Sequence, residues 1–245
     1  MANDFSKVEA CKTWWRFENN LNDSKGNNDL TNVNSLAFDQ TIVLEGAYSI
    51  LPTGTEYAKI TDADMDADNP LKSTVGGTFT CLGRFVMGTA HERQILGDYN
   101  GSKYGFDVFV TGGRCRAQVG YNAGANVTTV GHSTLLSDGT KYAFGFSYAE
   151  DDKGMRLRIW NLDTGAAVGS DATVTLGASR YASDADLQIC ARNGSYLWRD
   201  QLDEITILNE EYTVEQMDAY FQGNVVGSAG GISPLGLNPF TFRIK

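Results

Sequence analysis

The sequence predicts an all-β protein in which two antiparallel sheets pack as a sandwich, with one short helix near the C-terminus. Three observations lead to this prediction. Apolar and polar residues alternate in short runs, most clearly in Met155–Asn161, as is typical of a half-buried strand. Glycine turns such as Gly112–Gly113 separate the runs. The 245 residues include 27 glycines and 4 prolines, and 42% are hydrophobic, which fits many strands joined by tight turns.

The expected strands follow one another along most of the chain. The first ends in the aromatic cluster Trp14–Phe17. The segment Asp23–Asp29, rich in glycine and asparagine, is typical of a turn. The charged segment Glu150–Gly154 predicts the turn of a hairpin. Further strand-like runs are expected at Ser35–Phe38, Ala47–Leu51, Tyr57–Ile60, Thr78–Met87, Arg93–Gly97, Tyr104–Val110, Arg114–Val119, Lys141–Ala149 and Met155–Asn161.

One stretch near the C-terminus has the pattern of a helix. Thr213 and Gln216 have the spacing of a capping box, and Gly223 is a typical helix end. Residues 224–245 then form a glycine-rich link followed by an apolar strip. Because such a strip should not stay exposed to water, we expect it to pack on its own domain, residues 1–223, or to dock on a neighbouring subunit. The residues assigned to assembly are Leu235, Leu237, Phe240 and Phe242.

The composition argues against several classes of partner. The formal net charge is −10, so neither nucleic acid nor an anionic membrane surface is expected to bind. No apolar run reaches the roughly 18–20 residues that span a bilayer, so we expect no membrane insertion. The segment Met1–Glu9 lacks the basic and apolar regions of a signal peptide. The four cysteines lie far apart and are expected to be reduced and buried.

Segments at opposite ends of the chain form one recognisable pattern. The N-terminal part is Thr13–Glu18 followed by Asp23–Thr31, and the C-terminal part is Leu187–Arg192, Leu202–Leu208 and Thr213–Phe221. Together they resemble the laminin-G-like, concanavalin A-like jelly rolls, in which the first and last strands lie near each other. The resemblance implies a jelly-roll sandwich over residues 1–223, a fold that serves binding modules, structural proteins and a few glucanases.

The resemblance also implies a calcium site. Many members of the family bind one calcium between the N-terminal D-S-x-G turn and the aspartate of the L-D-E-I strand. The matching positions here are Asp23, Asn27 and Asn28 in the turn, and Asp203 in the strand. Carboxylate, amide and carbonyl oxygens are the ligands that calcium prefers. The alternative is that Asp23 and Asn27 make only turn hydrogen bonds, while Asp203 fixes the end of a strand.

The segment Asp62–Asn69 is a second cluster of acidic residues. Its alternating carboxylates resemble the start of a D-x-D-x-D calcium loop, but the glycine of the sharp turn and the closing glutamate are absent. We therefore interpret the segment as a solvated acidic loop.

Aromatic rings are candidates for stacking on sugars. Trp14 and Trp15 are neighbours in a strand, so one side chain must point inward and one outward. Trp160 ends an alternating strand and is expected in the core. Trp198 lies in a turn-like segment beside Tyr196, and we expect it to be the most exposed tryptophan. Trp198 and Tyr196 are the candidate ligand-binding residues, although packing against the edge of the sandwich is the favoured role of each tryptophan.

The sequence gives little support for catalysis. Glucanases of this fold usually carry E-x-D-x-x-E on one strand, and the chain has no such string. Asp203 and Glu204 are adjacent, so their side chains point to opposite faces. His91 and His132 are isolated in the sequence. We therefore expect no catalytic residues and no enzyme.

These observations favour a non-catalytic structural or interaction module. The acidic composition, the apolar tail and the lack of a signal-peptide pattern favour a virion component, such as a bacteriophage capsid, decoration or tail protein. It would assemble through its tail with other protein subunits, or as a homo-oligomer. The alternative is a lectin-like carbohydrate-binding module that binds a glycan with or without calcium. That module would be cytoplasmic, or at the cell surface if a processed segment is missing.

Overall fold

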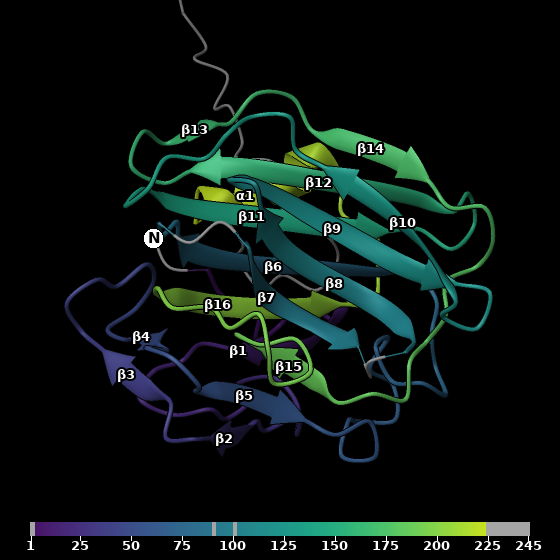
Figure 1. Ribbon diagram of the computed structural model, residues 1–245, viewed down its shortest axis with the longest axis horizontal. Coiled ribbons are helices and arrows are strands. Elements are labelled where there is room, and N and C mark those ends of the chain that lie inside the picture. Colours follow the sequence, from purple (N-terminus) through teal and green to yellow (C-terminus); the bar gives the residue numbers. More distant parts are fainter. Residues whose placement is uncertain (1–2, 90–91, 100–101, 224–245) are drawn as a thin grey trace, which may run out of the picture.

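The computed structural model describes residues 3–89, 92–99 and 102–223. Within them a sheet of nine strands packs on a sheet of seven (Figure 1), and every strand pair is antiparallel, which confirms the predicted jelly-roll sandwich. The nine-stranded sheet contains β1 (Cys11–Trp15), β3 (Ala37–Asp39), β4 (Ser49–Leu51), β6 (Phe79–Val86), β11 (Lys141–Tyr148), β12 (Gly154–Asn161), β13 (Ala166–Ala167), β14 (Ala172–Thr175) and β16 (Leu202–Leu208). The seven-stranded sheet contains β2 (Thr31–Val33), β5 (Tyr57–Ile60), β7 (Glu92–Tyr99), β8 (Tyr104–Thr111), β9 (Arg114–Tyr121), β10 (Asn126–Gly131) and β15 (Leu187–Ile189).

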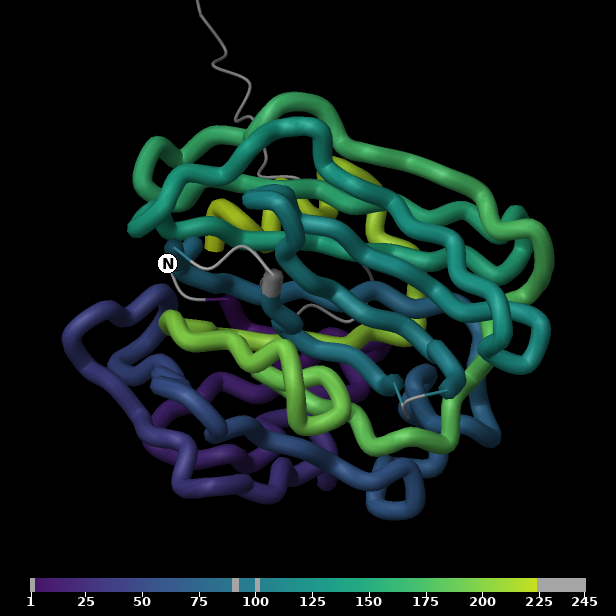
Figure 2. Tube along the Cα trace, viewed as in Figure 1, coloured from purple at the N-terminus to yellow at the C-terminus, as the bar shows by residue number. Residues whose placement is uncertain are grey.

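The first and last strands are neighbours in the nine-stranded sheet. β1 pairs with β16, with Trp15 opposite Ile205, and β16 pairs on its other side with β6. Figure 2 shows the result along the chain: the purple N-terminal part and the yellow-green β16 occupy the same side of the molecule. The expectation that the two ends of the domain lie together is confirmed for the described residues.

Aromatic side chains fill the space between the two sheets. Phe79 of β6 meets Phe106 of β8 across the sandwich, with ring centroids 5.1 Å apart. Phe79 also meets Phe146 of β11 at 5.6 Å. All three rings are fully buried, and burying one such side chain contributes about 1.5–3 kcal/mol. The core therefore supports the outer faces of both sheets rigidly.

The outer face of the nine-stranded sheet is covered by α1 (Val214–Phe221) and the N-terminal segment. Thr213 and Gln216 form both hydrogen bonds of the predicted capping box. Figure 1 shows α1 on the far side of β11 and β12. Trp14 belongs to this second apolar cluster, where its ring packs on Phe5 at 5.7 Å. Trp14 and Trp15 are therefore both buried, because this layer covers the outward-facing ring.

The turns explain the register of the long hairpins. Gly112 and Gly113 connect β8 to β9 with φ values of 55° and 71°, and two successive positive φ angles define the turn type that matches strand twist. The strands that the sequence did not predict are short or lie at sheet edges, among them β10 and β14. All four cysteines are buried and free, as expected.

Two predictions from the sequence concern residues beyond the described part. The assembly residues Leu235, Leu237, Phe240 and Phe242 lie outside the described residues, so their role stays a prediction, as does the domain boundary at residue 223. Among the helices of the described part, none has the length and apolarity to cross a bilayer.

Candidate functional site

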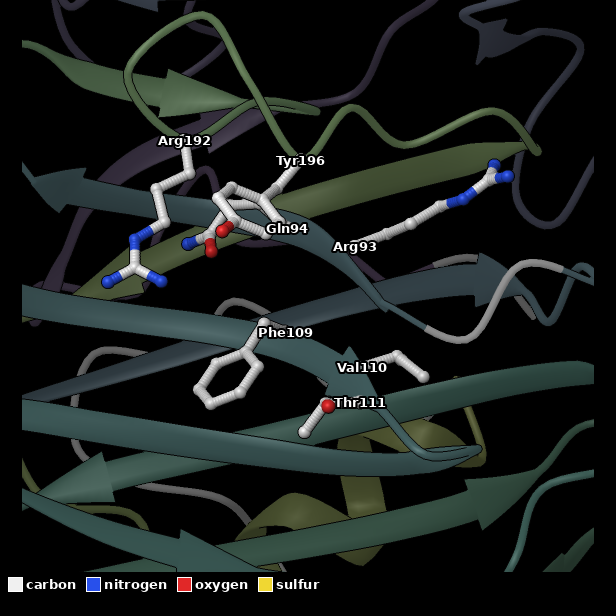
Figure 3. Close-up of a pocket in the computed structure, with 7 residues that line it drawn as sticks. All are labelled: Arg93, Gln94, Phe109, Val110, Thr111, Arg192 and Tyr196. Carbon is white, nitrogen blue, oxygen red and sulfur yellow. The ribbon is translucent and has the colours of Figure 1, made fainter.

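A pocket of about 160 Å³ opens on the outer face of the seven-stranded sheet. Side chains alternate along a strand, so Gln94 of β7 and its partner Phe109 of β8 line the floor together with Thr111. Val110 belongs to the buried core, and Arg93 lies opposite it in the ladder, so these two border the pocket from the other face. The loop between β15 and β16 supplies the side chains above this floor (Figure 3). The lining residues are Arg93, Gln94, Phe109, Val110, Thr111, Arg192 and Tyr196.

Backbone hydrogen bonds hold the loop between β15 and β16 against β7. The N–H of Cys190 donates to the Ile95 carbonyl at 2.8 Å, and the N–H of Gln94 donates to the Tyr196 carbonyl at 2.9 Å. Cys190 has a φ of 71° and Tyr196 a φ of 51°, a conformation that is uncommon for residues with a side chain. Such strain persists only where the surroundings enforce it. The loop is therefore tightly constrained where it carries the pocket residues.

Arg192 is held over a group of tyrosine rings. Its Cζ lies 4.4 Å from the ring centroid of Tyr99, 4.9 Å from that of Tyr104 and 5.8 Å from that of Tyr196. The Tyr99 and Tyr104 centroids are themselves 4.4 Å apart. Cation–π attraction contributes about 0.5–2 kcal/mol per contact, depending on desolvation. The guanidinium is thus oriented before any ligand arrives.

A buried row of polar side chains lies beneath the guanidinium. Gln94 Nε2 donates to Asp107 Oδ1 at 2.8 Å, and Gln118 Nε2 donates to Asp107 Oδ2 at 2.6 Å. Arg192 Nε is 3.8 Å from Asp107 Oδ2. Gly97 leaves room for this row, because a Cβ there would lie 2.1 Å from Asp107 Oδ1.

The charge of Asp107 is set by its surroundings. Burial raises the pKa of its carboxyl to about 7, and the smaller effects of the Arg192 guanidinium and the two glutamine amides act in the opposite direction. Near neutral pH the carboxyl is therefore partly protonated, and the average negative charge that faces Arg192 is less than one.

The two aromatic residues predicted to bind ligand have different positions. Tyr196 is 58% exposed and lines the pocket. Trp198 is only 1% exposed, and its ring packs edge-on against Phe85 with centroids 5.5 Å apart. The expectation that Trp198 is the exposed tryptophan is therefore wrong, because the chain turns inward two residues after Tyr196 and places the indole in the core.

The predicted calcium turn forms a cluster with the acidic loop. Asn28 Nδ2 lies 3.0 Å from Asp23 Oδ2, 3.1 Å from Asp66 Oδ2 and 3.2 Å from the Lys12 carbonyl oxygen. A Cβ at Gly26 would reach these same carboxylate oxygens at 3.0 and 2.6 Å. All three oxygens accept a hydrogen bond from the one amide group of Asn28, as in the alternative of turn hydrogen bonds, and oxygens of these kinds are also the ligands that calcium prefers. Asp66 is half-buried here, so the loop is not simply solvated as the sequence suggested.

The other two predicted calcium ligands have different neighbours. Asn27 donates its backbone N–H to Asp66 Oδ2 at 2.9 Å, so it lies beside the cluster. Asp203 Oδ2 accepts hydrogen bonds from the N–H groups of Leu44 and Glu45 at 3.3 and 2.8 Å, where it fixes the chain before β4. In the described part of the chain, no three His, Cys, Asp or Glu side chains are grouped to hold a metal. A calcium ion at Asp23 would therefore depend on backbone and amide oxygens for its remaining ligands.

Sequence reasoning found Tyr196 but missed the other pocket residues. Arg192 ends one of the motifs that carried the resemblance, and nothing in that motif indicates an exposed guanidinium over tyrosines. Gln94 and Phe109 are opposite each other in the β7–β8 ladder, a proximity that only strand pairing creates.

No protein-family model matches the chain, and no curated protein sequence matches it either. Solved structures do resemble it. Domain 4 of AbnA, an extracellular GH43 arabinanase from Geobacillus stearothermophilus solved with arabinotriose, has a TM-score of 0.58 and 13% identity, over 86% of this chain and 98% of that domain. The binding domain of Paraclostridial Mosquitocidal Protein 1 has a TM-score of 0.63 and 9% identity, over 87% of this chain and 52% of that one.

A structure of botulinum neurotoxin type C, whose cell entry depends on two ganglioside molecules, gives a TM-score of 0.64 at 10% identity, over 89% of this chain and 52% of that one. This chain therefore spans about half the length of the toxin binding domains. At these identities the similarity establishes the fold, a sandwich shared with domains of carbohydrate-binding proteins.

Proposed function

We propose that this protein is a non-catalytic carbohydrate-binding module whose site is the pocket on the outer face of the seven-stranded sheet. The observation that carries the proposal is an exposed Tyr196 ring beside an oriented Arg192, above a floor that includes Gln94. Binding sites of this kind combine flat apolar surface with a few fixed polar groups. A sugar ring would stack on the tyrosine, and its hydroxyls would bond the guanidinium, while the buried Gln94 amide supports the floor.

Similarity to a complete domain supports the proposal. Domain 4 of AbnA matches over nearly its whole length and was solved with arabinotriose. The toxin domains support it less directly, because this chain covers only half of each and their glycans are not tied to that half. Fold similarity alone does not imply function, so the proposal depends on the pocket residues.

The polar floor supports binding more than catalysis. Glycosidases place two carboxylates on either side of the scissile bond. The seven described residues that line the pocket include no carboxylate. Asp107, beneath them, is buried and accepts hydrogen bonds from two glutamines, Gln94 and Gln118. These contacts suit a structural carboxylate that orients neighbouring amides.

Glycan-array binding followed by calorimetry tests this function. The wild-type chain should retain one class of oligosaccharide, and Tyr196→Ala should weaken that binding about two- to tenfold, given about 0.5–1.5 kcal/mol for an aromatic contact. Val75→Ala removes another exposed apolar side chain that does not line the pocket, and it should bind as the wild type does. An array on which no oligosaccharide is retained would refute the proposed function.

We further propose that a calcium ion at the Asp23 turn has a structural role. Asp23, Asp66 and the Lys12 carbonyl would hold it, and its charge would neutralise the two carboxylates and tie the turn after β1 to the loop before β6. This position is on different segments from the pocket residues, so the ion would stabilise the fold without contacting the glycan. A virion location and assembly through residues 224–245 remain predictions of the sequence.

A further inference from the structure

The charged side chains that line the pocket are basic although the protein is acidic. Two of its seven described lining residues are arginines and none is acidic, whereas the whole chain has a net charge of −10. Figure 3 shows Arg192 and Arg93 at opposite ends of the group, with Tyr196 and Gln94 between them. Each arginine also has a carboxylate nearby, Asp107 for Arg192 and Asp200 for Arg93, so the arrangement of these two pairs decides whether either cation can bind an anion.

Arg192 shares its nearby carboxylate with two other donors. Its Nε makes no hydrogen bond although the atom is buried, and the nearest carboxylate oxygen, on Asp107, is 3.8 Å away. Both oxygens of that carboxylate already accept hydrogen bonds from Gln94 and Gln118. Arg93 lies at a similar distance from its own partner, with its Nη1 3.7 Å from the half-exposed carboxylate of Asp200, but Figure 3 shows its guanidinium pointing away from Tyr196. The arginine placed to meet an anion beside Tyr196 is therefore Arg192.

The loop and the tyrosines fix the orientation of the Arg192 side chain. Arg192 and Ser195 exchange backbone hydrogen bonds at 2.7 and 2.8 Å, which closes the turn between them. The neighbouring rings of Tyr99 and Tyr104, tilted by 34° against each other, then pack against the guanidinium. A planar, oriented guanidinium matches a carboxylate with two parallel hydrogen bonds, and little entropy remains to be lost on binding.

We propose, building on the glycan-binding function above, that the ligand is an acidic glycan and that Arg192 binds the carboxylate of its uronic or sialic acid. Tyr196 stacks on the sugar ring, while the guanidinium selects the charged group. Sulfated sugars share the negative charge but not the planar carboxylate, and the experiment separates the two.

The test uses the full chain on a glycan array built from matched pairs. The array carries oligogalacturonate and its methyl ester, sialyllactose and lactose, and sulfated lactose. The best-retained oligosaccharide and its uncharged partner are then titrated by calorimetry against the wild type, Arg192→Gln, Arg192→Lys and Arg156→Gln. Arg156 is the matched control, because its Nε is also buried without a hydrogen bond and lies 3.6 Å from a carboxylate, that of Asp171, on the other sheet.

We expect the wild type to bind a glycan that carries a carboxylate, and to bind the uncharged partner of that glycan about tenfold more weakly or worse. Arg192→Gln should bind the charged glycan about tenfold more weakly or worse than the wild type does. Arg156→Gln should bind it as the wild type does. Arg192→Lys should recover only part of the affinity, since lysine lacks the planar fork. Circular dichroism and thermal unfolding confirm that each variant is folded. Retention of neutral or sulfated sugars alone, or equal binding by Arg192→Gln, overturns this inference and leaves glycan binding in place. An array without any bound sugar refutes both.

Discussion

Arg84 carries a positive charge beneath α1, between two glutamates. Its Nε lies 2.9 Å from Glu204 Oε2 and its Nη2 lies 2.9 Å from Glu45 Oε2, and the side chains of Arg84 and Glu204 are only 6% and 1% exposed. The guanidinium also lies over the Tyr220 ring at 5.3 Å. Arg84→Met keeps much of the side-chain length and removes the charge, so it leaves the buried carboxylate of Glu204 and the partly buried one of Glu45 without their cation.

Removing one partner of a buried ion pair destabilises a fold by about 3–5 kcal/mol. We expect Arg84→Met to lower the free energy of unfolding by this amount at pH 7. Urea denaturation followed by tryptophan fluorescence measures it. The matched control is Arg156→Met, which removes an arginine from a surface pair whose side chains are 30% and 27% exposed. Surface pairs contribute about 0–1 kcal/mol, so the control should lose no more than that.

The pH dependence tests the same reasoning independently. Burial raises the pKa of Glu204, and the Arg84 guanidinium opposes that rise. Without Arg84 the pKa of Glu204 in the folded state should rise further. Since the folded variant then binds a proton that the unfolded chain releases, its stability should fall as pH rises from about 4.3, the unfolded value. The loss in Arg84→Met should therefore be smaller at pH 4.5 than at pH 7.

A second substitution distinguishes charge from packing. Glu204→Gln combined with Arg84→Met removes one of the stranded charges, so the double variant should be more stable than the sum of the single changes predicts. A stability loss below about 1 kcal/mol in Arg84→Met, or strict additivity in the double variant, would refute this reasoning. Neutralisation of the carboxylates by Arg84 would then not stabilise the fold beneath α1.

Three further predictions concern separate parts of the molecule. The pKa of Asp107 is raised to about 7 in the folded state, so the contribution of this group to the free energy of unfolding should fall as pH rises from about 4 to 7. Urea denaturation at several pH values should show this fall as a change in the stability difference between the wild type and Asp107→Asn. Calcium at about 100 times its Kd should add about 2.7 kcal/mol to the free energy of unfolding and so raise the Tm. Asp66→Asn or a chelator should abolish this rise, and an unchanged Tm of the wild type would exclude the ion. Light scattering should show an assembly of the full chain that is lost in a chain ending at Gly223 if the apolar tail joins subunits, whereas two monomers would refute the assembly prediction.

The sequence was sufficient for the fold because its information is local and repeated. Alternation in Met155–Asn161 reflects the two faces of β12, and the pair Gly112–Gly113 permits a turn with two positive φ angles. The capping box at Thr213 fixes the helix start through contacts within four residues. Short strands such as β10 were missed, because an edge strand with one exposed face needs no long apolar run.

The candidate site required the tertiary structure. The sequence picked out Tyr196, but the exposure of neighbouring Trp198 was decided by how the loop after β15 returns to the core, which no local pattern encodes. The contact of Arg192 with Tyr99 and Tyr104 joins segments about ninety residues apart along the chain. Asp66 reaches Asn28 across 38 positions in the same way. The sequence by itself therefore determined which segments become strands, while strand pairing and loop path decided which side chains meet, since these contacts depend on the packing of the whole sandwich.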